Sequence, residues 1–175
     1  DSHFEPCYCN RIITYTEMSL HDLAEQMFYL AQQINPDCAL CFYNIGNSLF
    51  TQSKYERAIW CWDKCAELDP KHPQIHFRLA QACWISGQGQ RARSEFVNEL
   101  RDNPTDLEVI LEFGYFLLES GDLEGAKEKF NRILEFDDSY APAKLYLGEV
   151  YLAEGNGFAA ERWYRRAIKS DPLLP

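Results

Sequence analysis

Apolar residues recur along the chain with the three- and four-residue spacing of amphipathic helices. They fall in blocks, and short polar breaks such as residues 52–54 and 120–122 separate one block from the next. Each pair of blocks therefore predicts a helix, a tight turn and a second helix. The longest apolar stretch, residues 27–34, is interrupted by two glutamines and is much shorter than the roughly 20 residues of a membrane-spanning helix. We expect no membrane insertion.

Small and aromatic residues repeat through these blocks with a period of 34 residues. In the second block of each unit, alanine is followed four residues later by a large ring, in the pairs Ala58 and Trp62, Ala92 and Phe96, Ala126 and Phe130, and Ala160 and Tyr164. In the first block, a small residue keeps the same interval at Gly46, Ala80, Gly114 and Gly148. Proline closes the units at Pro70, Pro104 and Pro172, and Asp138 takes its place in one of them. A period of this length is typical of stacked repeat architectures.

The recurring residue types have a physical explanation. A small residue on the first helix and an alanine on the second allow the two backbones to approach closely. We expect the ring four residues after each alanine to fill the gap between one helix pair and the next. Proline ends the second helix because it lacks the N–H group that a helix interior requires. One pair alone leaves an apolar face exposed, so the units must stack.

This pattern resembles the tetratricopeptide repeat (TPR) family, whose units read W-x2-L-G-x2-Y, then A-x3-F, then P. In the unit that matches best, the corresponding residues are Phe42, Ile45, Gly46, Leu49, Ala58, Trp62 and Pro70. The resemblance implies an all-α fold, a right-handed superhelical α-solenoid of stacked helix-turn-helix repeats. It covers four units at residues 39–72, 73–106, 107–140 and 141–175, the last with a truncated end. The chain departs from the pattern at Gly89, Asp138, Lys144 and Gly157.

Residues 1–38 are less regular, and we expect an N-terminal arm with a degenerate half-repeat there. A helix at about residues 19–35 keeps the register of the repeat, and Ser19 with Asp22 can cap its start. Its partner segment at about residues 5–17 includes residues 13–16, which favour extended structure, so we expect an irregular arm or a degraded helix. The chain begins with Asp and lacks a final capping helix, which predicts a segment of a longer protein.

Charge and motif content narrow the class of function. The chain has 27 acidic and 17 basic residues and a net charge of −10, which disfavours nucleic acid and anionic membrane surfaces as partners. We find no glycine-rich phosphate loop and no nucleophile paired with a base, so we do not expect an enzyme. The basic residues of the last block, Arg162, Arg165, Arg166 and Lys169, are expected to form a solvated face.

The TPR resemblance implies a concave groove, lined by the first helix of each unit, that binds a peptide or helix of a partner protein. The residues at the family's groove positions are Tyr43, Asn44, Asn47, Phe50, Phe77, Arg78, Gln81, Trp84, Glu108, Glu112, Tyr115, Tyr146 and Glu149. This set is aromatic and polar at one end and acidic at the other, which predicts a partner with an apolar anchor and basic residues. Some TPR proteins clamp a chaperone's C-terminal carboxylate with cations, but Glu108 and Glu112 stand at two of those positions, so we exclude that ligand.

The seven cysteines are an odd number, which rules out complete disulfide pairing within one chain. A reducing compartment is the simpler interpretation, and we expect a cytoplasmic protein. Two close pairs, Cys7-x-Cys9 and Cys38-x2-Cys41, could together hold a tetrahedral zinc ion. Free thiols and a disulfide are the alternatives for these four residues, and we expect no other cofactor.

Three functions fit these residues. The first is a protein–protein interaction scaffold that binds a peptide or helical segment in the groove, as part of a larger protein or complex. The second is a zinc-dependent regulatory or interaction module that uses the N-terminal cysteines. The third is the recruiting arm of an enzyme whose catalytic domain lies outside this segment.

Overall fold

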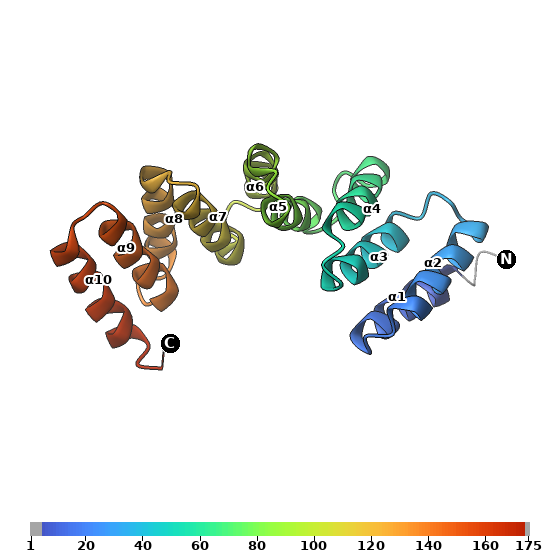
Figure 1. The fold of residues 1–175 in the computed structure, drawn as a ribbon, viewed down its shortest axis with the longest axis horizontal. Coiled ribbons are helices and arrows are strands. Elements are labelled where there is room, and N and C mark those ends of the chain that lie inside the picture. The colour runs from blue at the N-terminus through green and yellow to red at the C-terminus, as the bar shows by residue number, and fades with distance from the viewer. Residues whose placement is uncertain (1–4, 174–175) are drawn as a thin grey trace. The chain divides into compact units, whose positions relative to one another are not determined.

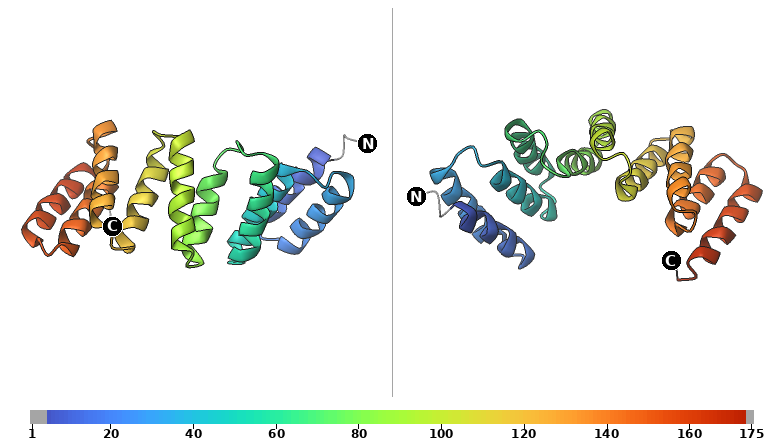
Figure 2. Two further views of the ribbon diagram at one scale, coloured as in Figure 1. Left: turned by 90° about the horizontal axis from the view of Figure 1, so that it is seen from above. Right: turned by 180° about the vertical axis from the view of Figure 1, so that it is seen from behind.

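The computed structural model describes the main chain of residues 5–173 and the side chains of residues 7–173. Every regular element in this range is an α-helix (Figures 1 and 2). The first five are α1 (Glu5–Glu17), α2 (His21–Ile34), α3 (Ala39–Thr51), α4 (Tyr55–Leu68) and α5 (Ile75–Ile85). They are followed by α6 (Gly89–Asp102), α7 (Leu107–Glu119), α8 (Leu123–Phe136), α9 (Ala141–Ala153) and α10 (Gly157–Ser170). The predicted all-α class is confirmed, and none of these helices is long and apolar enough to cross a membrane.

Successive helices pack against each other in pairs, α1 with α2, α3 with α4, α7 with α8 and α9 with α10. The pair α5 and α6 is joined by side chains that include Phe77 and Phe96, whose ring centroids lie 6.3 Å apart. The chain divides into two compact units, with the boundary between Glu99 and Leu100. The first unit contains α1 to α5 and most of α6, and the second contains α7 to α10.

The aromatic rings of the repeat lie on the small residues of their own helix pair. A Cβ atom added to Gly114 would come within 3.0 Å of the Phe130 ring. The same relation joins Gly46 to Trp62 and Gly148 to Tyr164. These rings therefore pack within their own pair, and Phe130 also reaches the next pair, as the sequence predicts, because it stacks on Tyr146 of α9. The ring occupies the space that the missing side chain leaves within one pair, and Phe130 is fully buried there.

The turn inside each helix pair contains a residue with positive φ, and these residues also recur at 34-residue intervals. They are Ser19 (57°), Ser53 (59°), Gly87 (79°), Gly121 (79°) and Gly155 (77°). Glycine enters this left-handed region without strain, whereas serine does so at a cost. Ser19 therefore occupies the turn and is not a helix cap, which corrects the prediction. The residue before α2 is Leu20, whose side chain makes no capping hydrogen bond.

The N-terminal segment forms a regular helix, α1, which pairs with α2, so the prediction of an irregular arm or a degraded helix at residues 5–17 beside a half-repeat is corrected. It packs against both α2 and α3, and Ile12 is completely buried. The burial of the side of α1 that packs on α2 and α3 outweighs the preference of residues 13–16 for extended structure. Ile12 holds the position of the small residue in the later pairs. At the ring position of this pair, Phe28 lies against Phe42 of α3, with centroids 5.4 Å apart.

Lys144 stands where the family pattern has a large apolar residue, and it is only 8% exposed. Its Nζ donates a hydrogen bond to Ser170 Oγ at 2.9 Å, which connects α9 to α10. A buried polar group is tolerated when it has such a partner. This departure from the repeat pattern therefore leaves the last helix pair intact.

Candidate partner-binding site

A cavity of about 510 Å³ lies within the second unit between α7 and α9, which are the first helices of two neighbouring pairs. Leucine side chains form its apolar wall, and two glutamates place carboxylates beside that wall. The lining residues are Tyr115, Leu118, Glu119, Leu145, Tyr146, Glu149, Leu152 and Ala153. An apolar recess with a few polar groups at its edge is the usual form of a ligand site in proteins.

Aromatic packing positions the two tyrosines of this cavity. The Tyr146 ring stacks on Phe130, with centroids 5.4 Å apart, and the Tyr115 ring lies 5.2 Å from that of Tyr146. Separations of this size are typical of favourable aromatic pairs. Because Phe130 is fixed against Gly114 in the core, the orientation of the cavity's rings follows from the repeat packing itself.

Neutral phenols are hydrogen-bonded to both carboxylates of the cavity. Tyr164 Oη donates to Glu149 Oε1 at 2.8 Å, and desolvation together with this bond raises the pKa of Tyr164 to about 12. A hydrogen bond to Glu119, followed by burial, raises the pKa of Tyr115. Both phenols therefore stay protonated at neutral pH and donate to the glutamates without cancelling their charge. This cavity is acidic and attracts cations.

The sequence predicted part of this lining. Tyr115, Tyr146 and Glu149 line the cavity, whereas Glu108 and Glu112 lie on α7 outside the lining, the first exposed and the second half-buried. The unpredicted lining residues are Leu118, Glu119, Leu145, Leu152 and Ala153. Each lies three or four residues from a predicted position on the same helix, so helical spacing is the signal that could have identified them.

In the first unit, two of the predicted groove residues are part of the core. Asn44 is 4% exposed, and its Nδ2 donates to the backbone oxygen of Cys9 at 3.3 Å. Phe77 is 3% exposed and packs on Phe96. The prediction that they contact a partner is corrected, because each faces a neighbouring helix. The remaining predicted residues of this unit are half-buried: Tyr43, Asn47, Phe50, Arg78, Gln81 and Trp84.

Several of these half-buried groups already have partners within the chain. The Tyr43 ring lies against the His72 ring, with centroids 4.2 Å apart. Arg78 Nη1 donates to Gln81 Oε1 at 3.2 Å, while the Arg78 Nε is enclosed without a hydrogen-bond partner. A buried guanidinium N–H without an acceptor is energetically unfavourable, so a conformation or ligand that offers an acceptor to this nitrogen would be stabilised.

A second cavity, of about 350 Å³, lies between α2, α3 and α4 in the first unit. Its lining is Glu25, Phe28, Tyr29, Ile45, Leu49, Arg57, Trp60 and Cys61. Glu25 forms ion pairs with Arg57 at 3.4 Å and with Lys54 at 3.7 Å. None of these lining residues belongs to the predicted groove. In the sequence, the features that could have indicated this cavity are two aromatic residues on second helices, Tyr29 and Trp60, which the structure shows to be exposed.

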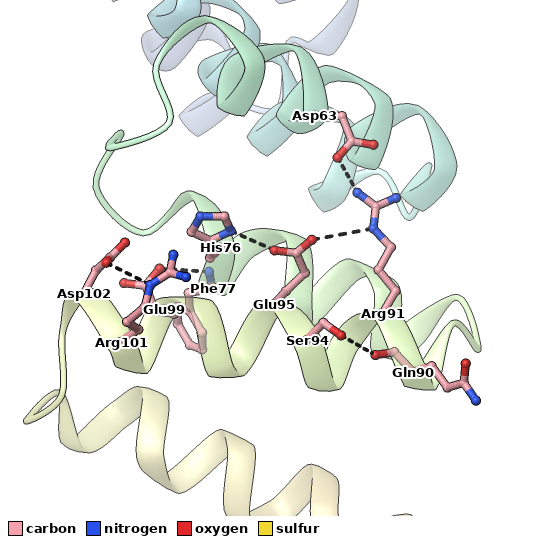
Figure 3. A network of polar contacts seen from close by, with 10 residues as sticks. All are labelled: Asp63, His76, Phe77, Gln90, Arg91, Ser94, Glu95, Glu99, Arg101 and Asp102. Atoms are coloured by element: carbon pink, nitrogen blue, oxygen red, sulfur yellow. Dashed lines mark hydrogen bonds and ion pairs between the residues drawn. The ribbon is translucent and has the colours of Figure 1, made fainter.

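Charged side chains connect α4, α5 and α6 in a network (Figure 3). Glu95 accepts from His76 Nδ1 at 2.7 Å and pairs with Arg91, which also contacts Asp63 of α4. The buried carboxylate of Glu99 accepts the backbone N–H of Phe77 in the first turn of α5 at 3.1 Å. This bond satisfies a donor that the helix start leaves free. The network connects the three helices to one another.

Three of the four predicted zinc ligands lie together, and the fourth does not. The sulfur atoms of Cys9, Cys38 and Cys41 all lie within 4.8 Å of one another, and all three residues are buried. A disulfide joins Cys9 to Cys41. Cys7 is exposed, because residues two apart on a helix point to different sides. The prediction of a four-cysteine zinc site is therefore corrected. Of the two alternatives, free thiols and a disulfide, the structure has a disulfide beside the thiol of Cys38.

Family models described as the tetratricopeptide repeat match residues 43–106 and residues 117–173. The chain is a member of the TPR family. Among curated relatives, TPR repeat-containing protein YpiA of Bacillus subtilis (strain 168) is 25% identical over 159 residues, which are 90% of this chain and 37% of YpiA. BBSome complex member BBS4 of Bos taurus is 29% identical over 130 residues, or 74% of this chain and 25% of BBS4. This TPR chain thus spans well under half the length of either relative.

Solved TPR structures share the fold at low sequence identity. A crystal structure of MamA has a TM-score of 0.89 at 15% identity and covers 100% of both chains. YrrB, described as a TPR protein with an unusual peptide-binding site, has a TM-score of 0.81 at 21% identity, with 95% of this chain and 86% of YrrB covered. A tetratricopeptide repeat protein of Parabacteroides merdae has a TM-score of 0.89 at 18% identity, with 98% and 68% covered.

Membership of the TPR family assigns a general role to this chain. TPR repeats are typically non-catalytic scaffolds for protein interactions, and protein partners are therefore the class to which its surface is suited.

Proposed function

We propose that this TPR protein binds an extended or helical segment of a partner protein in the cavity between α7 and α9. The observation that carries the proposal is the lining of this cavity, where a leucine wall stands beside two carboxylates. A large apolar side chain of the partner would fill the recess, and a neighbouring Lys or Arg would pair with Glu119 or Glu149. Grooves of this kind recognise helices and extended peptides through a few apolar anchors.

The charge of the chain supports a basic partner. The net charge is −10, and the two cavity carboxylates are hydrogen-bonded to phenols that carry no charge at neutral pH. Complementary charge accelerates association more than it deepens affinity, and salt screens the effect. The leucine wall would supply most of the affinity through slow dissociation.

The relatives favour a role inside an assembly. The chain spans 37% of YpiA and 25% of BBS4, and BBS4 is described as a member of the BBSome complex. We propose that this chain acts in the same general way, as an interaction segment of a larger protein or complex in the cytoplasm.

A peptide selection followed by kinetics tests the proposal. Random peptides selected on the purified chain should converge on a bulky apolar residue next to Lys or Arg. Leu145→Asp should then raise the dissociation rate at least about tenfold, since a charge would enter the apolar wall. Glu119→Lys should mainly lower the association rate and remove its decrease with added salt.

The matched control is a charge change on the last helix, Arg162→Glu, because Arg162 is exposed and lies outside the cavity lining. It should leave the dissociation rate at the parent value. The association rate should rise only modestly, because the chain becomes more acidic. If Leu145→Asp binds like the parent while Arg162→Glu abolishes binding, the interaction surface is α10 and the proposal is wrong.

A further inference from the structure

The three-cysteine cluster of Cys9, Cys38 and Cys41 lies where α1 meets the start of α3. Cys9 is on α1, Cys38 immediately precedes α3, and Cys41 is in its first turn. Their exposed fractions are 2%, 6% and 0%, respectively. Cys38 Sγ lies 2.7 Å from Cys41 Sγ and 3.5 Å from Cys9 Sγ. The third sulfur is thus next to both sulfurs of the disulfide.

The start of α3 places a backbone N–H donor at the sulfur of Cys38. Cys38 is the N-cap of α3, and its Sγ accepts the backbone N–H of Cys41 at 3.2 Å. The positive end of a helix and direct N–H donors both stabilise a negative sulfur. A hydrogen bond from Asn44 Nδ2 to the Cys9 backbone oxygen fixes α1 beside this helix start. The sulfurs are therefore held together by contacts that do not depend on the disulfide.

We propose that the cluster, once reduced, binds one thiophilic d10 cation through the sulfurs of Cys9, Cys38 and Cys41, and that Cu⁺ is the ion it suits. Reduction uses a small thiol: two RSH become RSSR while the Cys9–Cys41 bond becomes two thiols. The cation then replaces the protons of the three thiols, which pass to solvent. No electron transfer accompanies the binding step itself.

The number and type of donors favour Cu⁺ over Zn²⁺. Soft thiolate ligands select Cu⁺, zinc and iron–sulfur clusters, whereas structural zinc sites are almost always four-coordinate. Among the residues that the structure describes, the cluster offers three donor atoms within 4.8 Å, all of them sulfur. Cys7, the remaining cysteine of the N-terminal pairs, is exposed and outside the group. Three converging sulfurs satisfy Cu⁺ without a fourth ligand.

A bound cation would connect the same two elements as the disulfide. Under oxidising conditions the Cys9–Cys41 bond ties α1 to α3. Under reducing conditions the ion would do so instead, and the ligation energy would add to the stability of the folded chain. The first helix pair would then stay attached to the rest of the first unit in either redox state.

A competition titration tests this inference. The full chain is reduced with a phosphine, which is removed by gel filtration under argon because phosphines bind Cu⁺, and is then titrated with Cu⁺, supplied as its acetonitrile complex, against a coloured Cu⁺ chelator. The parent should remove one equivalent of Cu⁺ from the chelator, and X-ray absorption should show three sulfur neighbours. Loss of a residue that only supports metal ligands costs about 10–100-fold in affinity, so Cys38→Ser, which removes a ligand, should lose at least about 100-fold. Serine is itself a good N-cap, so this variant should retain its helical circular dichroism.

The matched control is Cys7→Ser, which removes a neighbouring exposed thiol and should bind Cu⁺ like the parent. A parallel titration with Zn²⁺ separates the two metals, and the parent should hold Zn²⁺ at least tenfold more weakly than Cu⁺. The inference is overturned if the reduced parent takes up no stoichiometric Cu⁺ or if Cys38→Ser binds as tightly as the parent. It is equally overturned if tight binding of either ion is lost in Cys7→Ser, because that result requires a four-thiolate site.

Discussion

At the scale of single residues, the repeat depends on an aromatic ring that covers a residue without a side chain. Phe130 is fully buried, and its ring occupies the space where Gly114 would carry a Cβ atom. The close approach of the two helices is therefore a consequence of one small and one large residue at matching positions. The same ring stacks on Tyr146, so core packing and the geometry of the cavity are linked through one side chain.

Gly114→Val should destabilise the second unit. The added methyl groups overlap the Phe130 ring, and overpacking of this kind costs about 1–3 kcal/mol, more than the few tenths gained in helix propensity. Denaturant unfolding monitored by circular dichroism measures the change. Gly157→Ala is the control, since no atom lies within 4 Å of the added carbon, and its stability should stay within about 0.5 kcal/mol of the parent. Equal stability of all three proteins would refute the packing assignment.

Three buried thiols are predicted to be unreactive at neutral pH. Desolvation raises the pKa of Cys61 and Cys65 to about 12 and that of Cys83 to about 11. Alkylation requires the thiolate, so iodoacetamide at pH 8 should label exposed Cys7 and spare these three in the native chain. Because their pKa values are raised on folding, their contribution to stability is present below about pH 9 and is lost as pH rises towards 11–12. Rapid native labelling of Cys61 by mass spectrometry would contradict this.

At the scale of helices and turns, the regular parts of the chain could be predicted from sequence, and the irregular parts could not. The 34-residue series located α3 to α10 because each helix pair repeats the same packing residues. The sequence does not specify the helix α1, since residues 13–16 favour extended structure and the helix depends on the burial of Ile12 against neighbouring helices. Serine suits an N-cap chemically and so predicts a cap at Ser19, but the residue lies in the 34-residue turn series and adopts a positive φ.

The turn series gives a pair of reciprocal predictions. Ser53 has φ of 59° and Gly121 has φ of 79° at equivalent turns. A left-handed residue other than glycine costs about 1–2 kcal/mol of stability. Replacing it with glycine recovers only part of this, because glycine also raises the conformational entropy of the unfolded chain. Ser53→Gly should therefore stabilise the chain by about 0.5–1 kcal/mol, and Gly121→Ser should destabilise it by a similar amount. Thermal melts of both variants test this, and a loss of stability in Ser53→Gly would contradict it.

At the scale of the whole molecule, family membership could be predicted from the repeat, whereas the lining of the cavity that we propose as the binding site could be predicted only in part. Tyr115, Tyr146 and Glu149, which are predicted as groove residues from their repeat positions on first helices, are part of the cavity lining. Asn44 is the repeat equivalent of Tyr146, and Phe77 is the repeat equivalent of Leu145, yet both are buried because α1 and α6 cover them. Which member of a periodic set faces solvent depends on contacts with neighbouring helices, and periodicity alone does not specify those contacts.

The most direct test of the interaction-scaffold account is to map a selected peptide on the chain by amide chemical-shift changes in NMR. The account predicts that the largest changes fall on α7 and α9, at Tyr115, Leu118, Leu145, Tyr146 and Glu149, and that they disappear in Leu145→Asp. Changes concentrated on α8 or α10 instead, or a pattern that Leu145→Asp leaves intact, would contradict it.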